Sequence, residues 1–139
     1  MLTKNSKLFK PQRTSYPMTL LDILKASVLE ELQGAQSEEK QGRYKNALIL
    51  YSKALFSLCD YVIIKNNLKP PNDHKERFEI LDQYFPFIYR TVKKVFRTYI
   101  DTYVKPTDQE SCEGMKHALR ELRETEKLDP AIKTALEQV

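Results

Sequence analysis

The sequence predicts an all-α fold, an up-and-down bundle of four to five helices followed by a short C-terminal helix. Apolar residues recur at steps of three and four along each long segment, as they do on one face of a helix. No segment alternates apolar and polar residues in the manner of a half-buried strand, and three glycines leave few tight turns. With 139 residues, the chain has the size of one domain and can bury a core without disulfides or metals.

The strongest helical pattern lies in residues 42–65. Its apolar positions share one face of a helix and predict the central core stripe, which consists of Tyr44, Ala47, Leu48, Tyr51, Ala54, Leu55, Leu58 and Val62. The alanines within this stripe are small, so that a neighbouring backbone can approach closely. We therefore expect this helix to organise the rest of the bundle.

A first helix is expected to begin after Thr19, because Thr19 followed three residues later by Asp22 predicts an N-cap pair. The helix ends near Gly42, since glycine suits the left-handed conformation that closes a helix. The short turn then sets the two helices antiparallel, as a helical hairpin. The predicted inward face of the first helix is Leu20, Leu24, Val28, Leu32 and Ala35.

The hairpin ends at Asn66-Asn67, because the Pro70-Pro71 pair cannot continue a helix. Asp73, followed three residues later by Glu76, predicts the start of a third helix over residues 74–84. Pro86 either kinks this helix or opens a fourth one as its first residue. The fourth helix is expected to reach about residue 103, with an inward face of Ile88, Val92, Val95, Tyr99 and Tyr103.

A fifth helix is predicted after the break at Lys105-Pro106, because Thr107-Asp108-Gln109-Glu110 has the spacing of a capping box. Its expected inward positions are Cys112, Met115, Ala118 or Leu119, and Leu122. Asp129-Pro130 then restarts a short terminal helix over residues 131–138, with Ile132 and Leu136 as its apolar contacts. The four longer inward stripes bury one another as a bundle.

The net charge of +4 comes from the first 17 residues, which we predict to be a basic flexible tail preceding a single helical domain over residues 18–139. Four basic side chains lie there, namely Lys4, Lys7, Lys10 and Arg13, and no acidic residue precedes Asp22. The remaining basic and acidic residues balance. Such a tail is typical of a solvated chain end, and a basic segment can also contact nucleic acid or an acidic partner.

Composition and cysteine use predict a cytosolic protein. No apolar run approaches the ~18 residues of a membrane span, and the N-terminus lacks the apolar core of a signal peptide. Cys59 and Cys112 both fall on predicted helices, and we interpret them as reduced core thiols.

Metal and nucleophile patterns are not evident in the sequence. The two histidines and two cysteines lack metal-ligand spacing, and isolated glycines cannot form a phosphate-binding loop. We therefore expect neither a metal nor a cofactor. The segment from Lys69 to His74 is more informative, because it puts a lysine and an imidazole at a helix start, where backbone N–H groups favour anions. A phosphate is one interpretation, and a simple connection across the end of the bundle is the other.

A basic face on the fourth predicted helix is the other candidate. Arg90, Lys94 and Arg97 recur at steps of four and three, with Lys93 alongside. This pattern is found on phosphate-binding helices, where Tyr89 or Tyr99 would stack on a base, and also on ordinary solvated faces. Asp101 lies four residues after Arg97, so an ion pair between them would absorb part of the charge.

Residues 40–55 resemble a tetratricopeptide repeat or a microtubule-interacting-and-transport domain. No second copy follows at a 34-residue period, so this likeness indicates a generic helical hairpin. The order of motifs over residues 20–126 instead resembles HEPN domains, the nucleotide-binding domains of higher eukaryotes and prokaryotes. The matching features are a Gly-x-Tyr-x-x-Ala helix, a Pro-containing link to a helix that begins with His, and an Arg…Asp-Tyr-like end with one extra residue. The residues that carry them are Gly42, Tyr44, Ala47, Tyr51, Ala54, Pro70, Pro71, His74, Arg97, Asp101, Tyr103 and Ala118.

The HEPN resemblance implies a helical bundle, commonly a homodimer, that binds nucleotides or RNA and often accompanies a nucleotidyltransferase. Some members are metal-independent ribonucleases with an Arg, four to six residues, then His, and this sequence lacks that motif. We therefore expect a non-catalytic nucleotide- or RNA-binding module with no membrane partner. The expected ligand contacts are Lys69, His74, Arg90, Lys94, Arg97, Tyr99, Asp101 and Tyr103.

Two alternatives stay open. One is a degenerate ribonuclease, with His74 as general base and Lys69 steadying the transition-state charge. The other is a tetratricopeptide-like protein-interaction module.

Overall fold

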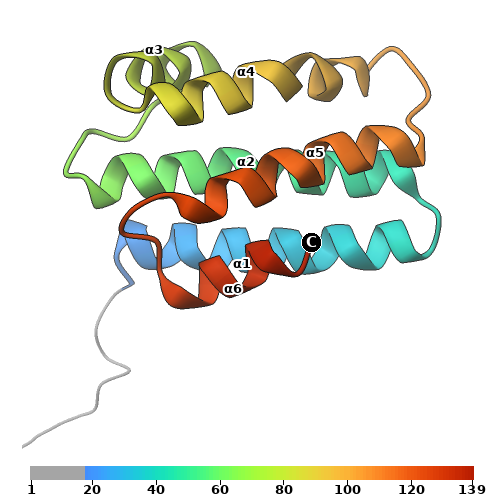
Figure 1. Ribbon diagram of the computed structural model, residues 1–139, viewed down its shortest axis with the longest axis horizontal. Coiled ribbons are helices and arrows are strands. Elements are labelled where there is room, and N and C mark those ends of the chain that lie inside the picture. The colour runs from blue at the N-terminus through green and yellow to red at the C-terminus, as the bar shows by residue number, and fades with distance from the viewer. Residues whose placement is uncertain (1–17) are drawn as a thin grey trace, which may run out of the picture.

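The computed structural model describes residues 18–139, and that part of the chain is helical without strands (Figure 1). The predicted all-α bundle is confirmed. The predicted basic tail lies outside the described residues. The elements are α1 (Leu20–Lys40), α2 (Tyr44–Lys65), α3 (His74–Tyr84), α4 (Pro86–Asp101), α5 (Gln109–Glu121), the 3-10 turn η3 (Leu122–Glu124) and α6 (Pro130–Glu137).

The helices lie in three layers (Figure 1). α3 and α4 form one outer layer, α2 and α5 the middle layer, and α1 and α6 the other outer layer, and the helices within each layer contact each other. α2 contacts α1, α3, α4 and α5. α2 is therefore the helix on which the others assemble, as its apolar pattern predicts.

The α1–α2 hairpin forms as predicted because local signals define both of its ends. The Thr19 hydroxyl accepts from the Asp22 N–H at 3.1 Å, and the Asp22 carboxylate accepts from the Thr19 N–H at 3.2 Å. Gly42 closes the turn with a φ of +78°. Gly34 brings the helices close together, since a Cβ there would lie 3.3 Å from Leu50 Cδ1.

The buried surface of α2 is wider than the predicted stripe. Seven of the eight stripe residues are buried, and Tyr44 is half-buried. Five further α2 residues are also buried, namely Ser52, Phe56, Cys59, Tyr61 and Ile63. The helix is covered on several sides, so a single face underestimates its contacts.

The expectation that no segment reaches membrane-spanning length was wrong for α2. By length and composition alone this helix could cross a membrane, but 67% of its most apolar window is buried inside the fold. A core helix of a folded domain passes the same length test. The burial agrees with its place in the middle layer.

The starts of the later helices follow their capping residues, with one correction. Asp73 accepts from the Glu76 N–H at 2.8 Å, and Pro86 is the first residue of α4, so it opens a helix rather than kinking one. The N-cap of α5 is Asp108 rather than Thr107. The Asp108 carboxylate accepts from both the N–H and the hydroxyl of Ser111, each at 2.9 Å.

Two predicted core positions were wrong. Leu20 is 44% exposed, because it lies in the first turn of α1, where Leu21 packs against the core instead. Tyr103 is 70% exposed, because α4 ends at Asp101. There the Thr102 hydroxyl donates to the Tyr99 carbonyl at 2.7 Å, and the chain turns away from the bundle.

The predicted inward residues of α5 and α6 are buried, and both cysteines are free and buried, as predicted. Burial raises the pKa of the Cys59 thiol to about 12 and that of Cys112 to about 11. Thiols with such pKa values are overwhelmingly protonated at neutral pH and therefore poor nucleophiles. They serve as core side chains.

Candidate functional site

His74 is the first residue of α3 and lies in an aromatic wall formed by α2 and α4. Its ring centroid is 4.6 Å from that of Phe56, 5.2 Å from Phe96 and 5.9 Å from Tyr99, all in edge-on arrangements. Edge-to-face pairs at these separations are favourable. The N-terminus of α3 is thus packed against the second half of α4.

Arg77, one turn further along α3, attaches this helix to α2. Its Nε and Nη2 donate to the two carboxylate oxygens of Asp60 at 2.7 and 3.0 Å. The side chains are only 12% and 18% exposed, and the guanidinium also lies 5.4 Å from the centroid of the Phe56 ring. Burial alone would lower the pKa of Arg77, but the hydrogen bonds and charge of Asp60 outweigh it and raise that pKa. Arg77 therefore carries its positive charge at neutral pH.

The remaining nitrogen of the same guanidinium contacts the imidazole. Arg77 Nη1 lies 2.8 Å from His74 Nδ1. Burial, and then the positive charge of Arg77, lower the pKa of His74 below its usual value. As an expected ligand contact, His74 could either form a hydrogen bond or, when protonated, pair with phosphate. Its surroundings favour the neutral form, which leaves the hydrogen bond.

A groove runs beside this wall between α3 and α4. It has a volume of ≈ 420 Å³ and is lined by Phe78, Tyr89, Lys93, Phe96, Arg97 and Ile100. Phe78 joins the aromatic residues of the lining, because its ring lies 4.8 Å from that of Phe96 and 6.3 Å from that of Tyr89. The Lys93 ammonium lies 5.5 Å from the centroid of the Tyr89 ring. Aromatic surface and positive charge therefore meet in one groove.

Side chains of both charges gather at the C-terminal end of α4. Arg97 Nε lies 3.2 Å from Asp101 Oδ1, which confirms the predicted ion pair, and Lys105 lies 3.6 Å from Asp101 Oδ2. The contact leaves Asp101 Oδ1 buried without a hydrogen bond among residues 18–139, so the pair is close but poorly aligned. Arg97 is 79% exposed. Its guanidinium can therefore exchange this partner for a ligand.

Arg90 continues the same stripe. At steps of three and four, Arg90, Lys93 and Arg97 share one side of α4. Arg90 is exposed and makes no polar contact to another residue of the described chain. Lys93 and Arg97 thus supply the positive charge of the groove lining, and Arg90 continues their stripe along α4 outside that lining.

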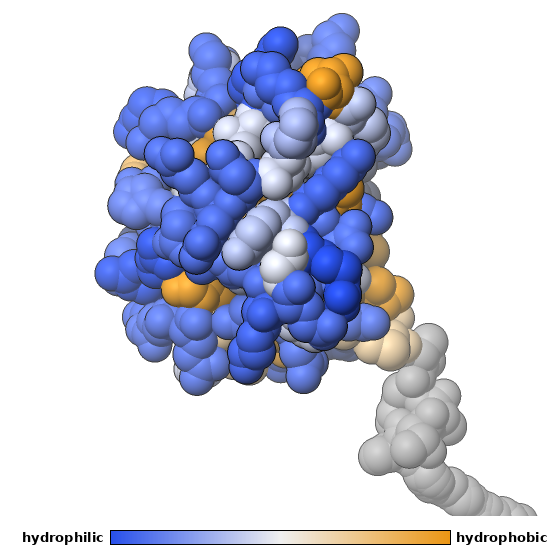
Figure 2. All heavy atoms as spheres, turned by 90° about the vertical axis from the view of Figure 1, so that its right-hand side faces the viewer, coloured by the Kyte–Doolittle hydropathy of each residue, from blue (hydrophilic) through white to orange (hydrophobic). Residues whose placement is uncertain are grey.

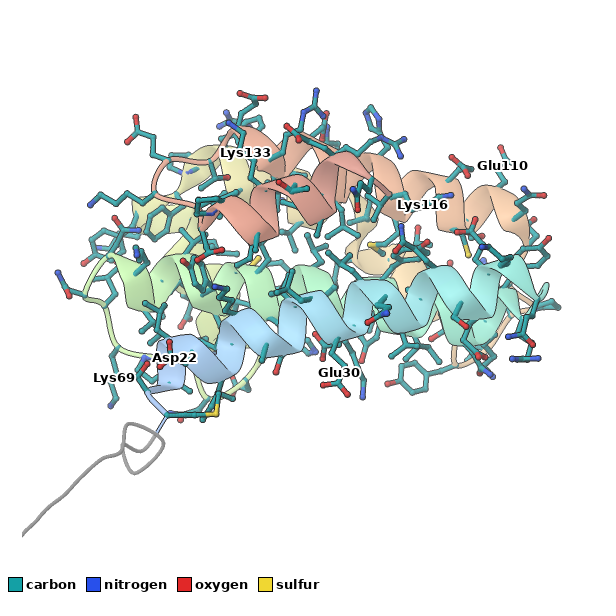
Figure 3. The ribbon with its side chains drawn as sticks, turned by 90° about the horizontal axis from the view of Figure 1, so that it is seen from below. Asp22, Glu30, Lys69, Glu110, Lys116 and Lys133 are labelled. Carbon is teal, nitrogen blue, oxygen red and sulfur yellow. The ribbon has the colours of Figure 1, made fainter. Side chains whose placement is uncertain are left out.

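Of the eight predicted site residues, Arg97 lines the groove and the other seven do not. Lys94 points to α5, where its ammonium lies 4.0 Å from Glu121. Lys69 is exposed and projects from the connection after α2, at the end of the bundle that also holds Asp22 (Figure 3). Tyr103 contacts the hydroxyl of Tyr99 at 3.1 Å beyond the end of α4. His74, by contrast, contacts Phe56. At a rise of ~1.5 Å per residue, Phe56 lies about 14 Å along the helix from the end of α2, where the connection with Lys69 begins.

Sequence reasoning missed three side chains that surround His74, namely Asp60, Arg77 and Phe56. One signal was present. Asp60 is the only acidic residue in α2, and a carboxylate in such an apolar helix requires a partner. Arg77 lies three residues after His74 and shares its side of α3.

A second polar cluster joins α1, α2 and α5. Glu39 accepts from the Tyr51 hydroxyl at 2.7 Å and from Lys116 at 2.9 Å, and Lys116 also pairs with Glu113 at 2.7 Å. Lys116 reaches from α5 across to α1 (Figure 3). Burial, reinforced by Glu39, raises the pKa of Tyr51. Each polar group has a partner, which is typical of a structural network.

Residues 18–139 contain no group of three His, Cys, Asp or Glu side chains placed to hold a metal ion. The end of the bundle with the α1–α2 and α4–α5 connections is mainly hydrophilic, with scattered apolar residues (Figure 2). No protein-family model matches the chain, and no curated protein or solved structure matches it either. Any functional assignment therefore depends on the geometry of the α3–α4 surface.

Proposed function

We propose that this protein is a non-catalytic module that binds nucleotides or single-stranded RNA in the α3–α4 groove. One observation carries the proposal: aromatic rings and exposed cations line the same groove of ≈ 420 Å³. Proteins that bind single strands combine these two features, because bases stack on aromatic rings while lysine and arginine neutralise the phosphates. The volume also falls in the range of about 300–1,000 Å³ that is usual for small-molecule sites.

The parts of the groove have different roles in this proposal. A base packs against the rings of Phe78 and Phe96, while Lys93 and Arg97 contact the phosphate on either side of it. Arg90 extends the cationic stripe and receives the next phosphate of a longer strand. Asp101 holds Arg97 until the ligand replaces it, so we assign Asp101 and Tyr99 to the support of the groove.

The arrangement of His74 supports binding over catalysis. A general base must offer an unprotonated nitrogen to its substrate. The nitrogen of His74 that accepts a proton is Nδ1, and Nδ1 already faces Arg77 at 2.8 Å. Lys69, the other member of the alternative ribonuclease site, projects from the end of the bundle (Figure 3). The degenerate ribonuclease is accordingly the weaker candidate.

The resemblance to HEPN domains supports the same function, and it includes residues outside the groove, such as Gly42, Tyr44 and Ala47 in α2. On that resemblance, the proposal includes a cytosolic homodimer that works beside a nucleotidyltransferase. Light scattering on the purified chain tests the dimer, and co-purification with a nucleotidyltransferase encoded in the same genome tests the partner.

Fluorescence anisotropy with labelled oligouridylate at low salt tests the binding function. Lys93→Ala and Arg97→Ala should each weaken binding and each reduce the slope of log K against log salt by about 1. Lys133→Ala is the matched control, because Lys133 is also exposed but lies on α6, in the layer opposite α3 and α4 (Figure 1). Absence of binding, or equal weakening by Lys133→Ala, would refute the proposal.

A further inference from the structure

The contacts of the three Arg77 guanidinium nitrogens determine the state of the His74 ring. Nε and Nη2 are taken by Asp60, and Nη1 lies 2.8 Å from His74 Nδ1. A guanidinium carries only donors, so Nδ1 must accept and the proton of the neutral ring must be on Nε2. The opposite ring orientation would put a C–H group against the Arg77 N–H and leave that donor without a partner. Ring orientation and tautomer are therefore both determined by Arg77.

Burial, and then the positive charge of Arg77, oppose a second proton on the imidazole and lower the pKa of His74, although Asp60 and Asp73 act in the opposite direction. From α2 it faces Phe56 and Asp60, and from α4 it faces Phe96 and Tyr99. Asp60 is already engaged by Arg77, and the other carboxylate nearby, Asp73, accepts from the backbone of Glu76. A proton on Nδ1 would break the hydrogen bond from Arg77 and put two cations side by side.

The remaining nitrogen, Nε2, is available to donate a hydrogen bond. It makes no hydrogen bond within residues 18–139. It is not sealed in the core either, because Asp101 Oδ1 is the one buried side-chain polar atom without a partner in that part of the chain. The imidazole lies against Phe96, whose ring also lines the groove. Nε2–H is thus a fixed, uncharged donor on a ring that packs against Phe96, a residue of the groove lining.

We infer that His74 is a specificity-determining residue, which donates from Nε2–H to an uncharged acceptor on a base and does not bind phosphate as a cation. This inference depends on the proposed function of the groove. The cations on the rim, Lys93 and Arg97, already supply the phosphate contacts. A neutral donor releases no counterion when it binds, so it adds base discrimination without salt dependence. Arg77 is the positioning residue that keeps the donor on Nε2.

Two substitutions of His74 separate the nitrogens. The side-chain amide of His74→Gln puts an N–H near the position of Nε2, whereas His74→Asn is shorter and reaches only the position of Nδ1. Anisotropy is measured with labelled oligomers of uridylate, cytidylate and adenylate over a series of salt concentrations. We expect His74→Asn to weaken binding of the preferred oligomer about tenfold and the others less, with the salt slope unchanged. His74→Gln should retain most of the preference.

The opposite result would overturn the inference. If His74→Asn weakens all three oligomers equally, or lowers the salt slope by about 1 as a lost cation does, His74 contacts the backbone. If His74→Gln and His74→Asn behave alike, the position of the donor is irrelevant, and the inference also fails.

The state of the ring can be tested without any ligand. In the ¹⁵N-labelled full chain at pH 7, the imidazole correlations of His74 should identify Nδ1 as the unprotonated nitrogen and Nε2 as the protonated one. Tautomer averaging or a proton on Nδ1 would refute the inference even if RNA binds. If the tautomer is as expected and no oligomer binds, the proposed function fails and with it the role of the donor.

Discussion

Replacing Arg77 by methionine should destabilise the protein strongly, because it leaves a carboxylate unpaired between two helices. Removing one partner of a buried ion pair costs about 3–5 kcal/mol. Asp60 and Arg77 retain 18% and 12% exposure, so some water reaches the carboxylate and we take the lower limit, about 3 kcal/mol. Loss of the contact with Phe56 adds about 0.5 kcal/mol. Against a typical stability of about 5–15 kcal/mol, this is a large loss.

Urea denaturation measures the loss, and a double variant identifies its cause. Arg77→Met should lower the urea midpoint without changing the m-value. Asp60→Leu should do the same, because it leaves the Arg77 guanidinium without its ionic partner. Apolar replacement of both partners is often neutral, so Asp60→Leu with Arg77→Met should lose less than Arg77→Met alone.

Two outcomes would refute this reasoning. If each single variant loses less than about 1 kcal/mol, the pair behaves like an exposed salt bridge and does not anchor α3. If the losses add in the double variant, Asp60 and Arg77 are not energetically coupled.

Three further predictions concern pH, the core and a helix cap. Because the folded state lowers the pKa of His74, the neutral ring contributes stability above about pH 6.5, which is lost as pH falls below that value. The urea midpoint of the unsubstituted protein should decline between pH 8 and pH 5, and the midpoint of His74→Gln should decline less. Equal declines in the two proteins would contradict the lowered pKa of His74. Leu48→Ala should cost ~2–4 kcal/mol because Leu48 is buried, whereas Leu20→Ala should cost less than ~0.5 kcal/mol in the same assay. Asp108→Ala should lower the urea midpoint more than Thr107→Ala does, because Asp108 accepts from the Ser111 N–H, and equal losses would contradict Asp108 as the N-cap.

Features set by neighbouring residues could be predicted from the sequence. Thr19 and Asp73 cap the helices expected of them, and Gly42 has the left-handed conformation expected of a closing glycine. Each depends on contacts within a few residues, which sequence spacing reveals directly. The correction at α5 has the same origin, because Asp108 and Thr107 are both good caps and spacing alone does not choose between them.

Features that depend on tertiary placement could be predicted only in part. The core stripe of α2 was evident, but burial of Phe56 and Ile63 on its other sides depends on which helices cover them. The pairing of Asp60 with Arg77 joins residues 17 positions apart, and no local spacing encodes it. Lys69 is close to His74 in sequence, yet the connection after α2 separates their side chains.

The basic side chains of this surface are not equally accessible to a ligand, although a count of basic residues treats them alike. The positive charge of Arg77 is used inside the protein, because its donors are divided between Asp60 and His74. Arg97 is 79% exposed and held by one poorly aligned contact to Asp101, so it can turn toward a ligand at little cost. In the proposed binding function, the arginine closest to His74 positions the ring and the arginine on the rim supplies charge. Base selectivity and phosphate affinity then depend on different residues, so that substitutions can change one without the other.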